Sequence, residues 1–235
     1  MWAMRLQNSK ITVLASLITL CGVANSADLE MWEEPSHQLV FNRDGTRVLD
    51  IRIVPGVLSE FHSHRYATAY VVVQDAKVKG QRAGGDWIDL SQRDRRPAGA
   101  MMDRPDYFAK PYVHRVENVD DRALHLLAVL NERDVGAEPD VAPADPGDLI
   151  DNAWFAEHRL SLAAGQTSDL LQFSNEVVLV QFDGGAGHVI EESVAHSPGT
   201  APGAFSWHAA DTAFRVSNDS DYAREYVIVE VKSVN

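Results

Sequence analysis

The chain carries the stretch Gly56-Val57-Leu58-Ser59-Glu60-Phe61-His62-Ser63-His64 and, later, the stretch His114-Arg115-Val116-Glu117-Asn118. Two residues that are separated by one position project to the same side of a β-strand. His62 and His64 can therefore point into one interior, and His114 can approach them from a second strand. The spacing predicts a single site built from three imidazoles.

Three neutral imidazoles are a suitable ligand set for one transition-metal ion. They leave one or more coordination positions open, which a catalytic metal needs in order to bind water, oxygen or substrate. The chain has only one cysteine, Cys21, so a cluster of thiolate ligands is excluded. We predict one divalent metal ion at His62, His64 and His114; the ligand set does not choose among iron, zinc, manganese, nickel and copper.

The surrounding sequence alternates between apolar and polar residues, which is typical of half-buried β-strands. In residues 48–53, Leu49, Ile51 and Ile53 share one face, while Asp50 and Arg52 share the other. Further strands are expected at 70–73, 123–130, 177–182 and 226–231, between turns rich in glycine and proline. Many short strands of this kind predict an all-β sandwich or barrel, with one short helix expected around 150–158.

At its histidine motifs the sequence resembles the cupin superfamily. That family combines a Gly, five further residues, His-x-His and a following Glu with a later Pro-x-Gly, His and Asn. The positions that match are Gly56, His62, His64, His114 and Asn118. The resemblance implies a jelly-roll β-barrel that holds a metal ion in its interior.

The chain departs from the cupin pattern at both motifs. Thr68 or Ala69 stands where the Glu is expected, and neither supplies a carboxylate. Ala109 and Pro111 stand in place of the usual Pro and Gly, although the distance to His114 is kept. The resemblance therefore implies a site with three histidine ligands and no Glu, a type known among iron dioxygenases of this family.

The motif spacing recurs in the second half of the chain without the histidines. Gly165 and Asn218 match the ends of the pattern, and Leu171, Phe173 and Phe214 occupy the ligand positions. We predict two tandem cupin-type barrels, of which the second is degenerate and holds no metal. The expected divisions are a signal peptide at 1–26, an N-terminal domain at 27–134, a linker at 135–149 and a C-terminal domain at 150–235.

Three further side chains are candidates for catalytic roles. Glu60, Tyr66 and Tyr70 share the even-numbered parity of His62 and His64, so continuous strand alternation would turn them toward the metal. Glu60 is the first choice for an extra ligand or a general base, and the two tyrosines could donate hydrogen bonds to a bound molecule. Arg104, Tyr107 and Tyr112 lie near the second motif and could line the mouth of the barrel, although a surface position is the default expectation, and His125 is expected to be structural rather than a ligand.

The first 26 residues have the pattern of an export signal. Arg5 and Lys10 precede the apolar run 11–23, and Ala24-Asn25-Ser26 offers small residues before a cleavage site. The mature protein is thus expected to be periplasmic or extracellular and free of cysteine. The formal net charge of −13 argues against nucleic acid and against an anionic membrane surface as partners.

These observations favour a mononuclear metal-dependent enzyme that acts on a small anionic or oxygen-chelating molecule. A dioxygenase is slightly favoured over a lyase or an isomerase. One alternative is a non-catalytic barrel that binds a small ligand or a metal, and another is a structural two-barrel module. The expected partner is a small-molecule substrate or ligand, and the sequence leaves open whether the protein forms a homo-oligomer.

Overall fold

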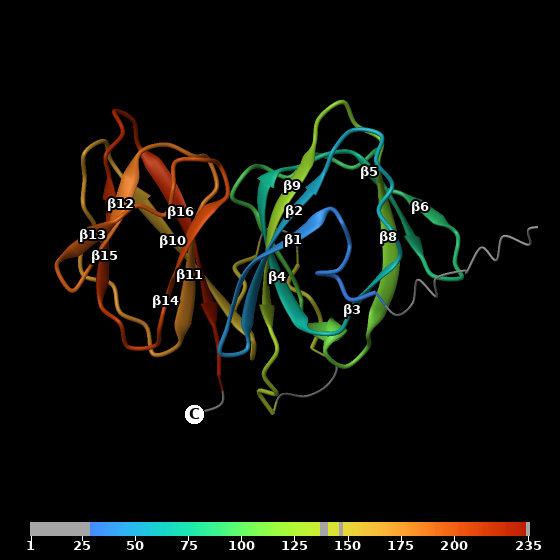
Figure 1. Ribbon diagram of the computed structural model, residues 1–235, viewed down its shortest axis with the longest axis horizontal. Coiled ribbons are helices and arrows are strands. Elements are labelled where there is room, and N and C mark those ends of the chain that lie inside the picture. Colours follow the sequence, from blue (N-terminus) through green and yellow to red (C-terminus); the bar gives the residue numbers. More distant parts are fainter. Residues whose placement is uncertain (1–28, 137–140, 146–147, 234–235) are drawn as a thin grey trace, which may run out of the picture.

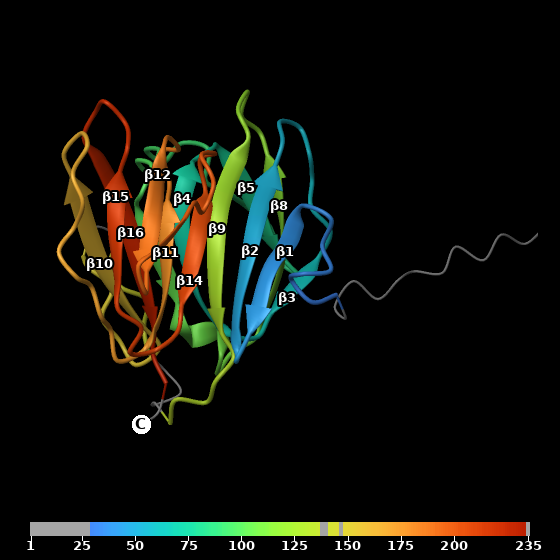
Figure 2. The ribbon, with the colours of Figure 1, turned by 60° about the vertical axis from the view of Figure 1, so that its left-hand side comes forward.

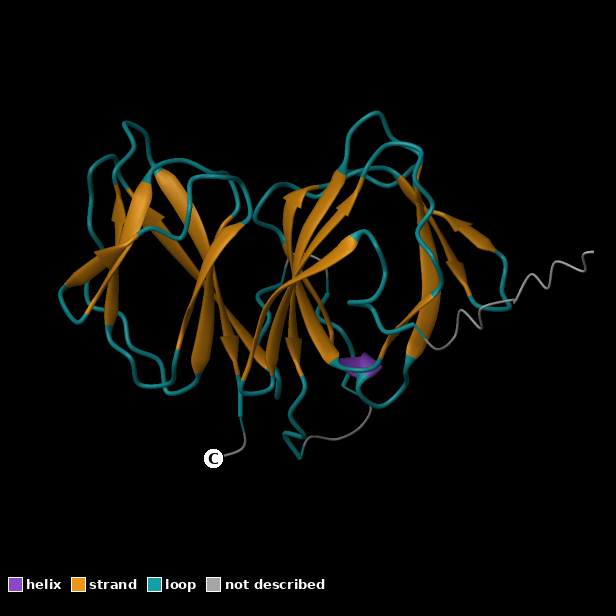
Figure 3. Ribbon diagram, in the orientation of Figure 1, coloured by secondary structure: helices purple, strands orange, loops and turns teal. Residues whose placement is uncertain are grey.

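The computed structural model describes residues 29–136, 141–145 and 148–233. These residues form β-strands joined by loops, together with the short helical turn η2 (Pro105–Tyr107), and they build two jelly-roll barrels side by side (Figures 1 and 3). The predicted all-β class with two tandem barrels is confirmed. The predicted signal peptide lies outside the described residues. No described helix is long and apolar enough to cross a membrane.

The first barrel consists of two antiparallel sheets. The larger has the order β1 (His37–Arg43), β2 (Thr46–Ile53), β9 (Leu124–Asn131), β4 (Ala67–Gln74), β7 (Met101–Arg104). The smaller has the order β3 (His62–His64), β8 (Tyr112–Asn118), β5 (Val78–Arg82), β6 (Trp87–Asp89). The smaller sheet carries the three histidines of the predicted site.

The second barrel repeats this arrangement with the orange and red strands of Figure 1. One sheet has the order β10 (Phe155–Leu162), β16 (Arg224–Val231), β11 (Glu176–Gln181), β14 (Ala204–His208). The other has the order β13 (Val194–His196), β12 (Gly187–Glu191), β15 (Phe214–Asn218). The view in Figure 2 shows that the strand axes of the two barrels are roughly aligned.

The two barrels share one apolar core. It combines buried side chains of β2, β4 and β9 with those of β10, β11 and β16, and Trp154 lies among them. Strand β4 shows why the core is shared, because it is apolar on both faces. Ala67, Ala69 and Val71 face the second barrel, while Tyr70 faces the interior of the first. Strands that are apolar on both faces are buried on both faces. The sheet that closes the back of the first barrel is therefore also a packing surface for the second.

Each barrel also has its own interior cluster. Leu49, Ile51 and Ile53 line the inside of the first barrel, as the alternation in residues 48–53 predicts. Leu179, Phe214 and Ile228 are among the corresponding residues of the second barrel.

A buried asparagine fixes a loop in each barrel. The Asn118 Nδ2 group donates hydrogen bonds to the Ile53 carbonyl at 2.7 Å and the Arg122 carbonyl at 2.9 Å, and its Oδ1 accepts one from the Asp120 N–H. Asn218 binds the carbonyls of Leu162 and Tyr222 in the same way, and its Oδ1 accepts from the Ser220 N–H. The asparagine of the second motif thus has a structural use that does not depend on a metal.

The helix expected around 150–158 is wrong. The Asn152 Oδ1 accepts hydrogen bonds from the N–H groups of Trp154 and Phe155, which makes a local turn, and β10 begins at Phe155. The side chains of Ile150 and Trp154 lie in the shared core. Tertiary packing therefore decides the structure of this segment.

Candidate metal centre

Two neighbouring strands of the first barrel bring the three predicted histidines together. Strands β3 and β8 are antiparallel, and His62 is the direct partner of His114 in their register. His64 lies two residues along β3, on the same face as His62. His62 and His64 are buried, and His114 is half-buried.

The nitrogen atoms of these histidines converge. One nitrogen from each ring lies within 4.8 Å of the others, and the Nε2 atoms of His64 and His114 are 2.8 Å apart. The ring centroids of His62 lie 4.9 Å from those of both His64 and His114. No other group of three His, Cys, Asp or Glu residues in the described part of the chain is arranged to hold a metal ion.

Neighbouring groups orient two of the rings. The His62 Nδ1 lies 2.9 Å from the Glu60 carbonyl, which makes Nδ1 the protonated nitrogen and leaves Nε2 as the one with a free lone pair. That Nε2 is buried and has no hydrogen-bond partner among the described residues. The His64 Nδ1 lies 3.2 Å from the hydroxyl group of Tyr70, which is also buried.

Burial keeps all three rings in the form that binds metals. It lowers the pKa of His62 to about 4, and the nearby His37 ring adds to this effect. Burial also lowers the pKa values of His64 and His114 well below 6.5, and the neighbouring imidazoles lower them further. The Nε2 atoms of His64 and His114 are at hydrogen-bond distance, and a bound metal ion would displace the proton that they share, whereas the His62 Nε2 has no partner for its lone pair. The donor set, the convergence and the unpartnered His62 Nε2 together fit a bound transition-metal ion.

The positions at which the cupin pattern has its Glu provide no other ligand in this chain. The Thr68 hydroxyl donates to the Tyr66 carbonyl at 2.9 Å, and Ala69 faces the shared core. The metal charge would therefore be balanced by a bound anion rather than by a carboxylate of this cluster.

Of the three predicted catalytic residues, only the side chain of Tyr70 contacts one of the three histidines. Tyr70 reaches the site through His64, as described above. Glu60 is exposed and contributes its carbonyl group to His62, because β3 begins only at His62 and strand alternation does not extend back to Glu60. Tyr66 lies between β3 and β4 and stacks on Trp32 at a centroid distance of 6.0 Å.

The structure adds a fourth histidine that the motif analysis missed. His37 is buried, with its ring 4.5 Å from that of His62 and its Nδ1 2.8 Å from the Met31 carbonyl. The Glu34 carboxylate accepts a hydrogen bond from the Glu60 N–H at 3.3 Å, so the segment before β1 packs against the approach to β3. No spacing rule links His37 to the other histidines, because this contact depends on the tertiary fold.

An aromatic and cationic cluster also borders the triad. Tyr107 is buried and lies 4.9 Å from the His64 ring, and Tyr112 stacks on Tyr107 and lies 4.9 Å from the His114 ring. The Arg104 guanidinium covers Tyr107 at 4.2 Å and forms two hydrogen bonds to Asp106. The expected surface placement is thus wrong for Tyr107, because η2 turns its ring toward the histidines.

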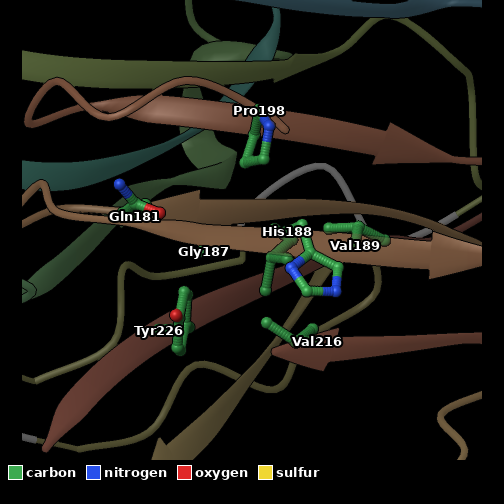
Figure 4. Close-up of a pocket in the computed structure, with 8 residues that line it drawn as sticks. Gln181, Gly187, His188, Val189, Pro198, Val216 and Tyr226 are labelled. Carbon is green, nitrogen blue, oxygen red and sulfur yellow. The ribbon is translucent and has the colours of Figure 1, made fainter. Parts of the chain in front are cut away.

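The corresponding positions of the second barrel are apolar. Leu171 and Phe214 are partners in an antiparallel β-bridge, as His62 and His114 are register partners in the first barrel. Phe214 stacks face to face on the buried His208 at 3.9 Å. A hollow elsewhere in this barrel, lined by Gln181, His188, Tyr226 and neighbours, is too narrow to hold a water molecule (Figure 4). Neither feature offers a site for a ligand.

No protein-family model and no curated protein matches the sequence. Solved structures do match the fold. AerE from Microcystis aeruginosa is 12% identical with a TM-score of 0.60, over 85% of this chain and 94% of that one. The pirin YhhW from Escherichia coli, solved with nickel(II), is 16% identical with a TM-score of 0.55, over 84% and 91%. Salicylate 1,2-dioxygenase from Pseudaminobacter salicylatoxidans is 11% identical with a TM-score of 0.50, over 79% and 71%.

At these identities the likeness concerns the fold. It agrees with the cupin-type jelly roll that the sequence predicts.

Proposed function

We propose that this protein is a mononuclear metal-dependent enzyme whose divalent ion is held by His62, His64 and His114. The observation that carries the proposal is the convergence of three neutral imidazole nitrogens within 4.8 Å in a buried site. A metal bound there would supply Lewis-acid or oxygen-binding chemistry at its open positions.

The residues around the triad orient the histidine rings and limit the access of water to them. The Glu60 carbonyl fixes the His62 tautomer, and the Tyr70 hydroxyl restrains the His64 ring. Tyr107 and Tyr112 cover the side of the triad formed by His64 and His114, and they limit the access of water there.

The substrate we propose is a small anion or an oxygen chelator. Three neutral ligands leave the charge of a divalent ion uncompensated, which favours negatively charged oxygen donors. A dioxygenase reaction is slightly favoured over a lyase or isomerase reaction. It is supported by the three-histidine ligand set without Glu and by the fold likeness to a salicylate dioxygenase. The second candidate is a barrel that binds a small ligand or metal without turnover.

Elemental analysis of protein purified without chelator or nickel resin tests the metal site. We expect one equivalent of metal in the wild type and in His188→Ala, a control in the second barrel. We expect none in His62→Ala or His114→Ala, with circular dichroism confirming that both stay folded. Metal retained by these two variants would refute the site. A metal-loaded protein that consumes no oxygen and converts none of a panel of small organic acids would favour the binding protein.

We further propose that the protein is exported, with residues 1–26 removed, and that its domains span 27–134 and 150–235. The mass of the mature protein recovered from its host tests the cleavage. A chain that retains Met1 to Ser26 would contradict it.

A further inference from the structure

Arg82 ends strand β5 directly beside the histidine triad. In the antiparallel register of β5 and β8, Arg82 is the partner of His114, and Gly80 is the partner of Val116. Val78 and Val116 both belong to the interior cluster of the first barrel. Because side chains alternate along a strand, Gly80 and Arg82 share the inner face with Val78.

The Tyr112 ring contacts both the guanidinium group of Arg82 and the His114 ring. The guanidinium group lies over the Tyr112 ring, with Cζ 5.6 Å from the centroid, and the Tyr112 ring lies 4.9 Å from that of His114. The side chain is exposed, so a molecule arriving from solvent can reach it.

The charge of Arg82 is not neutralised by any described carboxylate, since the one described contact of its guanidinium is with the Tyr112 ring. Arg104, which approaches the same ring at 5.5 Å, differs because Asp106 binds it through two hydrogen bonds. In a protein with a net charge of −13, an arginine left without an acidic partner next to the triad is suited to an anion.

The inner face of β5 also leaves space beside Arg82. A Cβ atom added at Gly80 would meet no heavy atom within 4 Å. A glycine inside a strand often marks a place where a ligand approaches the backbone closely. The open space and the uncompensated cation thus lie on one face, next to the triad.

We propose that Arg82 binds a carboxylate of the substrate, and that the substrate is a small organic acid with a second oxygen donor for the metal at its other end. This inference rests on the proposed function, because the second oxygen donor of the substrate would bind the metal ion held by the triad. Arginine is suited to this role because its planar guanidinium can hold a carboxylate through two parallel hydrogen bonds.

Calorimetric titration of the purified protein with oxalate, malonate, succinate and glutarate tests the proposal, with acetate and butyrate as monocarboxylate probes. We expect a dicarboxylate to bind more tightly than either monocarboxylate. We expect Arg82→Gln to weaken that binding about 10- to 100-fold without changing the metal content. Lys79→Gln removes a cation from the opposite face of the same strand and should leave the affinity unchanged. Gly80→Val should fill the space and abolish binding while the metal is retained.

Different results overturn the two proposals. Metal-loaded Arg82→Gln that binds dicarboxylates as tightly as the wild type refutes the role of Arg82 and leaves the metal site intact. Equal weakening by Lys79→Gln refutes it as well, since the effect would then come from net charge. Protein without metal contradicts the proposed function. In that case a loss of dicarboxylate binding in Arg82→Gln would still support Arg82 as the anion anchor, and unchanged binding would refute it.

Discussion

Replacing Asn118 by alanine should destabilise the protein strongly without removing the metal site. The side chain makes three hydrogen bonds, and the substitution leaves the Ile53 and Arg122 carbonyls and the Asp120 N–H without this partner. The bond to Ile53 is buried, so its loss costs about 1–3 kcal/mol, and the two less buried bonds add about 1 kcal/mol each. We expect a loss of about 3–5 kcal/mol in the free energy of unfolding. For a chain of this size, this corresponds to a decrease of roughly 10 °C in Tm.

Urea unfolding followed by tryptophan fluorescence and circular dichroism measures this loss. Asn118→Asp keeps the acceptor but turns a buried carboxylate oxygen toward the two carbonyls, so it should be at least as unstable as Asn118→Ala. Asn218→Ala removes the equivalent bonds in the second barrel and should cost a similar amount. A cost below about 1 kcal/mol for Asn118→Ala would refute the reasoning. A loss of metal from a folded Asn118→Ala would show that the motif asparagine serves the metal site directly.

Three further predictions concern other parts of the molecule. Tyr70→Phe removes the hydroxyl group 3.2 Å from the His64 Nδ1, so metal affinity measured by chelator competition should fall about 10- to 100-fold, and an unchanged affinity would contradict the orienting role. Burial raises the pKa of Asp75, but hydrogen bonds from Arg93 and the Arg96 N–H outweigh this effect and lower it below 3.8. Because the pKa is lowered in the folded state, the ionised Asp75 carboxylate stabilises the fold above pH 3.8. This stabilisation is lost as the pH falls below that value and the carboxylate becomes protonated. Asp75→Asn should therefore cost about 1–3 kcal/mol at pH 7 and far less near pH 2, and an equal cost at both pH values would exclude the ion pair as its source. Trp154→Ala opens the shared core and should cost about 3–5 kcal/mol with one unfolding transition, whereas two separate transitions would show that the barrels fold independently.

The strands and the triad could be predicted because both depend on short-range periodicity. Alternation in residues 48–53 identifies the inner face of β2 directly. The His-x-His spacing requires only that β3 be a strand, and the register of His62 with His114 then completes the cluster. A period of two residues is a property of the extended chain itself, so it can be read without knowledge of the tertiary structure.

The positions of Glu60 and Tyr107 and the contact of His37 could not be predicted, because they depend on where strands begin and on contacts between distant parts of the chain. Glu60 is two residues before His62 and would face the same side if the strand extended to it. It precedes the first residue of β3, however, and is exposed. Tyr107 reaches His64 because η2 interrupts the chain after β7, a turn that the apolar pattern does not reveal. His37 meets His62 only because the segment before β1 folds back over the barrel.

The shared core has a consequence for how such a chain can change. Tyr70 lies on β4 between Ala69 and Val71, and both of these neighbours pack against the other barrel. The second barrel lacks the histidine triad, but the first barrel still depends on it. Its removal would expose the apolar outer face of the sheet that carries Tyr70, whose hydroxyl group contacts His64. The interior of the second barrel holds no ligand histidine, as Leu171 and Phe214 illustrate, so apolar substitutions there should leave the metal site unchanged, whereas its outer face must keep a shape that fits the first barrel. Substitutions on that outer face are where remote changes in metal affinity should arise.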